Sequence, residues 1–135
     1  MIKLLTVILL TAVPTSYQQN VNLAKKEKKH LFVFFTEDWC VWCQKMKSEV
    51  LDEKEVSDFM KKNYIIYYTK DKTLKQKLQM QDSIPSYAIV DPMNEEVLNR
   101  GQGYKNKNSF FKWQNSTWKQ PIRPLKVFFK KIGDI

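Results

Sequence analysis

The sequence predicts one α/β domain with a central mixed β-sheet flanked by helices. The chain has 135 residues, 43% of them hydrophobic and 13% aromatic, which suits one packed core and argues against a second independent domain. Residues 31–35 form an unbroken apolar run (LFVFF), which is typical of a buried central strand. Strand-like and helix-like segments then alternate along the chain, as in a sheet with helical connections.

The first half of the chain predicts two strands and two helices. Residues 30–35 (HLFVFF) are the buried strand, and residues 39–50, after a short loop, have helical composition. Residues 52–63 form a second helix with its apolar side chains on one side. Residues 64–69 (YIIYYT) are β-branched and aromatic, so they predict a strand. Residues 17–29 are interpreted as a polar connection with a run of charges.

The second half predicts one helix, two strands and a last helix. Residues 71–81 are rich in Lys, Gln and Leu and indicate a helix. Residues 86–90 predict a strand entered through Pro85, and a turn containing Pro and Asn leads to another strand over 96–100. Residues 106–117 carry several aromatic side chains and predict the final helix.

The amino terminus has the pattern of a secretory signal peptide. Lys3 supplies a positive charge, residues 4–13 are an apolar run, and turn-prone and small residues follow. The run is shorter than the ~20 residues that span a bilayer. We expect residues 1–16 to be a signal peptide cleaved near Ser16 or Tyr17, and the protein to be extracytoplasmic, in the periplasm or cell envelope or secreted. The alternatives are an uncleaved membrane anchor, or a first strand or helix buried in the domain.

The net charge of +9 lies mainly at the carboxyl end. Residues 17–104 carry 14 basic and 13 acidic residues, whereas residues 105–135 carry eight basic residues and one acidic residue. The net charge therefore says little about the chemistry of the expected domain, residues 17–118. The secretory pattern also argues against nucleic acid as a partner.

The carboxyl-terminal extension, residues 119–135, has an amphipathic helical pattern. Leu125, Phe128, Phe129 and Ile132 recur at helical spacing, with lysines on the other faces. Such a helix can dock on a membrane surface or a partner protein. The alternative, which we favour because the segment is short, is that it folds back onto the apolar surface of its own domain.

The motif with the clearest chemistry is WCVWC, which contains the two cysteines of the chain, Cys40 and Cys43. It lies where the buried strand gives way to a helix, so Cys40 faces unpaired backbone N–H groups and the positive end of the helix dipole, which favour a thiolate. Cysteines three residues apart on one turn are close enough to bridge. We expect Cys40 to attack a substrate disulfide and Cys43 to displace the mixed disulfide.

Other roles for the pair fit the sequence less well. Zinc needs further ligands, and the single histidine, His30, cannot complete the site. A haem attachment needs His after the second Cys, where this chain has Gln44. A structural disulfide is an alternative, although a bridge that closes so small a loop contributes little stability. No metal or other cofactor is expected.

Taken together, these residues resemble the thioredoxin superfamily over about residues 28–117. The matching features are the strand at 31–35, Trp39, Cys40, Cys43, Ile84, Pro85 and Gly101. The resemblance implies a thioredoxin fold in which the bond before Pro85 is cis and the proline faces the cysteines. It also implies that Trp39 shields the disulfide, that Ile84 tunes the substrate groove and that Gly101 lines it.

The sequence departs from cytosolic thioredoxin in two respects. The dipeptide between the cysteines is Val-Trp, and the motif is closer to exported thioredoxin-like domains such as the C-terminal domain of the bacterial thiol-disulfide interchange protein. The buried Asp–Lys pair that assists the resolving thiol in thioredoxin is matched here by Phe34 and Ile66, which are uncharged. Glu37, Asp38 or Lys47 could take its place, although each is more readily interpreted as solvated surface.

We therefore expect an exported thiol-disulfide oxidoreductase that exchanges electrons between Cys40–Cys43 and protein or small-molecule thiols. The resemblance slightly favours the reductive direction, and the electron donor or acceptor is not identified. The alternative is a redox-idle thioredoxin-fold module that binds a client or an envelope partner. The uncharged positions and the basic tail favour this alternative, and the intact cysteine pair argues against it.

Overall fold

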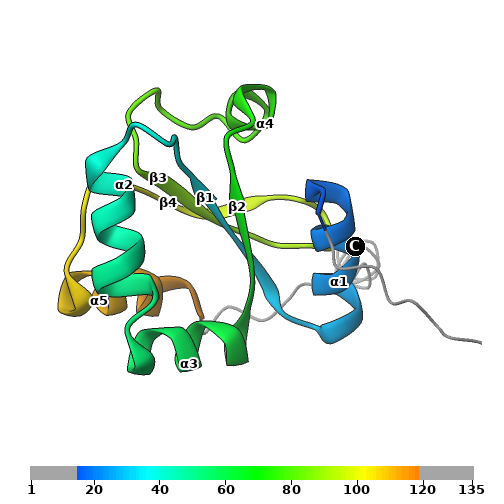
Figure 1. Cartoon of the computed structure of the whole chain (residues 1–135). Coiled ribbons are helices and arrows are strands. Elements are labelled where there is room, and N and C mark those ends of the chain that lie inside the picture. The colour runs from blue at the N-terminus through cyan, green and yellow to red at the C-terminus, as the bar shows by residue number, and fades with distance from the viewer. Residues whose placement is uncertain (1–14, 119–135) are drawn as a thin grey trace, which may run out of the picture.

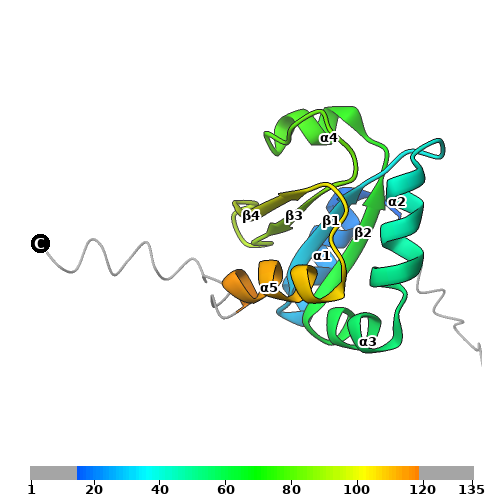
Figure 2. The same cartoon turned by 90° about the vertical axis from the view of Figure 1, so that its left-hand side faces the viewer.

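The computed structural model describes residues 15–118, in which a four-stranded sheet lies between two layers of helices (Figure 1 and Figure 2). The strands are β1 (His30–Phe35), β2 (Tyr64–Thr69), β3 (Ser86–Val90) and β4 (Val97–Gln102). Their order in the sheet is β2-β1-β3-β4. Strands β1 and β2 are parallel, and β3 is antiparallel to both β1 and β4. The predicted mixed sheet is therefore confirmed.

The helices divide between the two faces of the sheet. The first face is covered by α2 (Val41–Met46), the π-helical turn η1 (Lys47–Leu51), α3 (Lys54–Asn63) and α5 (Lys107–Trp118). The second face is covered by α1 (Tyr17–Glu27) and α4 (Lys72–Lys77). Both faces of β1 are thus buried, which is why all six of its side chains are buried and its sequence is almost entirely apolar.

Successive side chains of the central strands enter two different cores. Phe32 and Phe34 of β1 pack with Tyr87 and with residues of α2, α3 and α5 in the first core. Leu31, Val33 and Phe35 pack with α1 and α4 in the second core. The first core also contains Cys40 and Cys43, so the packing of this face fixes the position of the cysteine pair.

The helix α1 is the element that the sequence interpretation missed. Residues 17–29 read as a polar connection because only three residues of α1, Asn20, Val21 and Ala24, are buried. The local signal is at its start, where Ser16 and Gln19 form a capping box. The helix ends at Lys28, whose backbone adopts a left-handed conformation with φ 56°.

Two other predicted helices have different bounds. The segment expected over 39–50 begins at Val41, because Cys40 is the N-cap, and its second half is the π-helical turn η1. The segment expected over 71–81 is helical only from Lys72 to Lys77, since the chain turns after Leu78. The predicted strands over 64–69 and 86–90 agree with β2 and β3.

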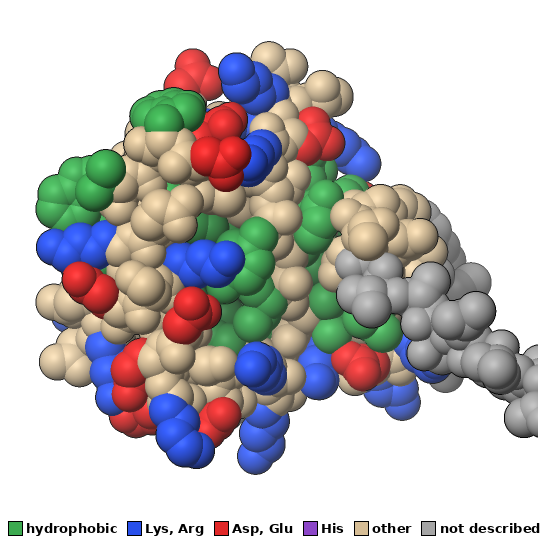
Figure 3. Space-filling view, viewed as in Figure 1, with side chains coloured by type: hydrophobic (Ala, Val, Ile, Leu, Met, Phe, Trp, Pro, Cys, Tyr) green, Lys and Arg blue, Asp and Glu red, His purple; other side chains and the backbone are tan. Residues whose placement is uncertain are grey.

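No other strand within residues 15–118 pairs with the outer edge of β2. Figure 3 looks onto this edge, where hydrophobic side chains line the strand. No helix within residues 15–118 is long and apolar enough to cross a membrane. The expected signal peptide (1–16, apart from its last two residues) and the tail (119–135) lie outside the described residues.

Candidate active site

The cysteine pair lies at the carboxyl end of β1, where the first core meets the surface. Cys40 is the N-cap of α2, and Cys43 lies in its first turn. The two form a disulfide with their Cα atoms 5.2 Å apart. The backbone N–H of Cys43 donates a hydrogen bond of 3.1 Å to the Sγ of Cys40. After reduction, the same N–H would face a Cys40 thiolate, which the helix N-terminus stabilises.

The surroundings of the disulfide are apolar and strongly exposed. Trp39, Val41 and Trp42 have exposed fractions of 75%, 74% and 55%. The cysteines between them are buried, Cys43 to 1% exposure and Cys40 to 5%. Cys40, which we expect to be the attacking thiol, is slightly the more exposed of the two. Exposed large apolar side chains that gather at one place mark an interaction surface.

Aromatic rings pack around Phe34, one of the two uncharged residues that the resemblance matched to the buried Asp–Lys pair. The ring of Phe34 stacks on that of Tyr87, with centroids 5.9 Å apart. The register of β1 and β2 puts Tyr68, rather than Ile66, directly opposite Phe34, and their rings meet edge to face at 5.7 Å. Tyr68 is therefore the strand residue that contacts Phe34 directly. Burial raises the pKa of Tyr68 to about 12, so its hydroxyl stays protonated at neutral pH.

No Asp, Glu, Lys or Arg is buried in this core within the described residues; the buried His30 and Asp91 lie at the opposite end of the sheet. Of the three surface candidates, Asp38 forms an ion pair of 2.6 Å with Lys70. The ammonium of Lys47 lies 4.7 Å from the centroid of the Tyr68 ring. Asp38 and Lys47 thus have partners outside the cysteine pair, and no Asp, Glu, Lys or Arg of residues 15–118 is buried in the first core.

The second wall of the site is the loop that ends in Pro85. The Ile84–Pro85 bond is cis, as the resemblance implied. The Lys75 ammonium binds this loop by donating to the carbonyl of Asp82 at 2.9 Å. The carbonyl of Pro85 accepts a hydrogen bond of 2.8 Å from the backbone N–H of Gly103. These contacts fix the loop from α4 on one side and from the end of β4 on the other.

The two glycines of this region have different tasks. Gly101 lies on β4 directly opposite Tyr87, and a Cβ at Gly101 would collide with the Tyr87 ring. Gly103 has a positive φ of 76° and carries the N–H that binds Pro85. Sequence reasoning singled out Gly101 for the groove and missed Gly103, although the Gly-x-Gly pattern contained both.

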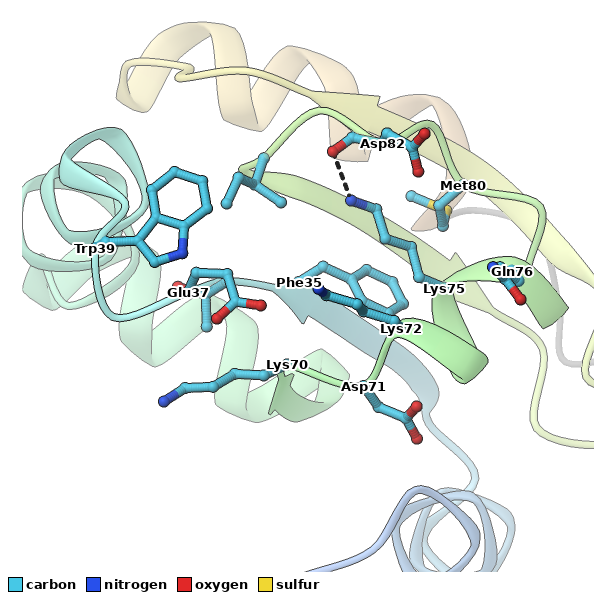
Figure 4. Close-up of a pocket in the computed structure, with 12 residues that line it drawn as sticks. Phe35, Glu37, Trp39, Lys70, Asp71, Lys72, Lys75, Gln76, Met80 and Asp82 are labelled. Atoms are coloured by element: carbon cyan, nitrogen blue, oxygen red, sulfur yellow. Dashed lines mark hydrogen bonds between the residues drawn. The ribbon is translucent and has the colours of Figure 1, made fainter.

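A cavity of about 440 Å³ is lined by Trp39, the residue before Cys40, although neither cysteine lines it (Figure 4). Trp39 and Ile84 line it near the disulfide, and α4 contributes Lys72 and Lys75. Figure 4 shows the Glu37 side chain between Trp39 and the α4 side of this cavity. The cavity brings together two residues predicted for the groove, Trp39 and Ile84, from loops far apart in sequence.

No group of three or more His, Cys, Asp or Glu side chains that could hold a metal ion occurs between residues 15 and 118.

Comparisons with known proteins agree with this geometry. A family model described as Thioredoxin-like matches residues 12–92. The disulfide bond reductase DsbH of Chlamydia pneumoniae is 26% identical over 100 residues, which cover 64% of this chain and 60% of that protein. An uncharacterized protein of Archaeoglobus fulgidus is 34% identical over 53 residues, 39% of this chain and 42% of that one. The chain thus spans about half of the length of these curated relatives.

Solved structures show the same fold. A thioredoxin from Thermus thermophilus superimposes with a TM-score of 0.65 at 20% identity, over 74% of this chain and 82% of that one. The oxidised C-terminal domain of DsbD from Neisseria meningitidis gives a TM-score of 0.56 at 17% identity, over 71% and 87%. With a family match over more than half of its length, the chain belongs to the thioredoxin-like family.

Proposed function

We propose that this protein is a thiol-disulfide oxidoreductase that reduces disulfides of client proteins outside the cytoplasm. The observation that carries the proposal is the disulfide at the amino end of α2, with Cys40 at the N-cap and Cys43 behind it in the first core. A disulfide within one turn constrains the fold very little. Its placement among exposed apolar side chains supports exchange with another protein.

In the proposed reaction, the Cys40 thiolate attacks one sulfur of a client disulfide. A mixed disulfide forms between Cys40 and that sulfur, and the second client sulfur leaves as a thiolate, which takes up a proton from solvent. Cys43 then loses its proton and attacks the Sγ of Cys40, which releases the first client sulfur. The client gains two electrons and two protons, and the protein ends with the Cys40–Cys43 disulfide.

The apolar interior bears on the second step. Because no Asp, Glu, Lys or Arg of residues 15–118 is buried in the first core, the proton of Cys43 leaves toward solvent or toward the departing client sulfur. We infer that the contact between Phe34 and Tyr68 stabilises the core by packing but provides no internal acceptor for the proton of Cys43. This is also the observation that favours the second candidate, a redox-idle module that only binds its client.

The direction and the cellular location are supported by different features. The reductase name of the Chlamydia relative supports reduction, which requires an electron donor that re-reduces Cys40–Cys43. The Lys3 and 4–13 pattern supports export to the periplasm or cell envelope. Mass spectrometry of the native protein tests export. If the protein is found in the cytosol with residues 1–16 still attached, the proposal of export is contradicted.

The test of the reaction is the reduction of insulin with dithiothreitol as electron donor. Wild type is expected to accelerate the reaction, and Cys40→Ser to leave the uncatalysed rate. Cys43→Ser should accumulate a mixed disulfide through Cys40, visible as a mass increase on non-reducing electrophoresis. If all three proteins match the uncatalysed rate, the redox-idle module is the better description. Trapping through Cys43 in the Cys40→Ser variant would reverse the assigned roles.

A further inference from the structure

The exposed apolar side chains beside the disulfide do not stand alone. Figure 3 shows hydrophobic side chains protruding at the end of the molecule where α2 begins. Trp42 belongs to this group, and its ring lies 5.7 Å from that of Tyr104, which precedes α5. The ammonium of Lys45 lies over both rings, 4.9 Å from the Trp42 centroid and 5.6 Å from that of Tyr104. We call Trp42, Lys45 and Tyr104 the recognition face.

The recognition face is held in place before any client arrives. The Tyr104 hydroxyl donates a hydrogen bond of 3.0 Å to the carboxylate of Glu49, and this bond raises the pKa of Tyr104. The cation above the two rings restrains the indole further. An aromatic side chain that is already fixed loses little conformational entropy when a partner binds. Trp42 is therefore arranged as a contact for another molecule.

The charges of this face are unbalanced. Lys45 has no carboxylate within ion-pair distance among residues 15–118, and neither does Lys105, whose ammonium lies 5.7 Å from the Tyr87 centroid. The neighbouring carboxylate of Glu49 is already bound by Tyr104. The Lys45 ammonium, which has no acidic partner, thus lies over an exposed indole, and the complement of this pair is an apolar group next to a carboxylate.

The face is continuous with the reacting atoms, because Trp42 lies in the sequence between Cys40 and Cys43. We propose that it selects protein clients whose reacting cysteine is flanked by an apolar residue and an acidic residue. The apolar side chain covers the Trp42 ring, and the carboxylate pairs with Lys45. This proposal rests on the proposed exchange reaction and adds the class of client that the reaction takes.

The test uses the reduced full chain and symmetric disulfides of short peptides in a single turnover. The cysteine is flanked on both sides by Phe-Glu, Phe-Lys or Ser-Glu, and two peptide thiols form for each enzyme disulfide. At low salt, we expect the Phe-Glu peptide to react about two- to fivefold faster than Phe-Lys, and about three- to tenfold faster than Ser-Glu. The first ratio should shrink in 1 M salt because the charges are exposed.

Variants test whether the recognition face causes these differences in rate between the peptides. Lys45→Glu should bring the Phe-Glu to Phe-Lys ratio to one or below, and Trp42→Ala should bring the Phe-Glu to Ser-Glu ratio toward one. Lys26→Glu on α1, which makes the same change in net charge on the second face of the sheet, should leave both ratios unchanged. Wild-type ratios near one, or equal effects of Lys45→Glu and Lys26→Glu, overturn the proposal.

Hydroxyethyl disulfide, which is small and uncharged, separates the two levels of inference. If the protein reduces it faster than free dithiothreitol does but treats the three peptides alike, the recognition face is refuted and the exchange reaction stands. If the protein reduces neither hydroxyethyl disulfide nor the peptides above the uncatalysed rate, both proposals fail.

Discussion

Gly101→Ala is expected to destabilise the fold through one identifiable collision. The added Cβ would meet the ring of Tyr87 on the neighbouring strand. That ring has little freedom to move, because it stacks on Phe34 at 5.9 Å and packs edge to face against Trp113 at 4.8 Å. Its hydroxyl also donates a hydrogen bond of 3.1 Å to the carbonyl of Gly103.

The magnitude follows from these contacts. Overpacking of a well-filled core costs ~1–3 kcal/mol, and the restrained ring of Tyr87 argues for the upper part of this range. A displaced ring also loses its hydrogen bond to Gly103, which is worth ~1 kcal/mol. We therefore expect Gly101→Ala to lower the free energy of unfolding by about 2–4 kcal/mol. For a domain of this size, the melting temperature should fall by at least about 8 °C.

Urea unfolding followed by circular dichroism measures the change in the free energy of unfolding. Two further variants test whether the collision with Tyr87 causes this change. The Cβ added by Gly103→Ala meets no atom within 4 Å. This variant should therefore lose only the free energy that a φ of 76° costs a non-glycine residue, about 1 kcal/mol. The double variant Gly101→Ala/Tyr87→Leu should be less destabilised than the sum of its single changes, since leucine vacates the space that the Cβ needs. If Gly101→Ala costs no more than Gly103→Ala, the collision does not occur and the reasoning is refuted.

The remaining predictions concern other parts of the fold. In the full chain, which keeps Ser16, Ser16→Ala removes the N-cap of α1 and should cost ~1 kcal/mol in urea unfolding, whereas Ser57→Ala within α3 should have little effect. Burial lowers the pKa of His30, so its contribution to stability is present above the unfolded pKa near 6.5 and is lost as the pH falls through the folded value; unfolding at pH 5 and 7.5 should show a smaller difference in His30→Gln. Lys75→Met frees the Asp82 carbonyl and should raise KM for insulin two- to fivefold with kcat nearly unchanged; an equal loss in kcat would contradict a positioning role.

The strands were predictable because their signal is local and dense. The six residues of β1 and the six of β2 are nearly all apolar, aromatic or β-branched, and the cysteine motif marks the start of α2 without any knowledge of packing. The helix α1 was missed because few of its residues are apolar: Val21 and Ala24 are buried in the second core, and Tyr17 and Leu23 pack against it. Its capping residues Ser16 and Gln19 were the available signal.

The sequence suggests which residues belong to the candidate site, but not how they contact one another. Cys40, Cys43, Trp39 and Pro85 follow from a motif and its order in the chain. The neighbour of Phe34 depends on strand register, which places Tyr68 opposite it, and a shift of two residues cannot be read from composition. The contact between Trp42 and Tyr104 joins residues 62 positions apart (104 − 42), and only the fold reveals it.

Tyr87 connects the stability of the core with the geometry of the active site. Its ring supports Phe34 beneath the cysteine pair, and its hydroxyl holds the Gly103 carbonyl. The N–H of the same residue, Gly103, fixes the carbonyl of Pro85. A buried aromatic cluster can therefore position both walls of the groove without any charged group inside. What it cannot supply is a proton acceptor for Cys43, so we infer that this chain gains a rigid site at the expense of internal proton transfer.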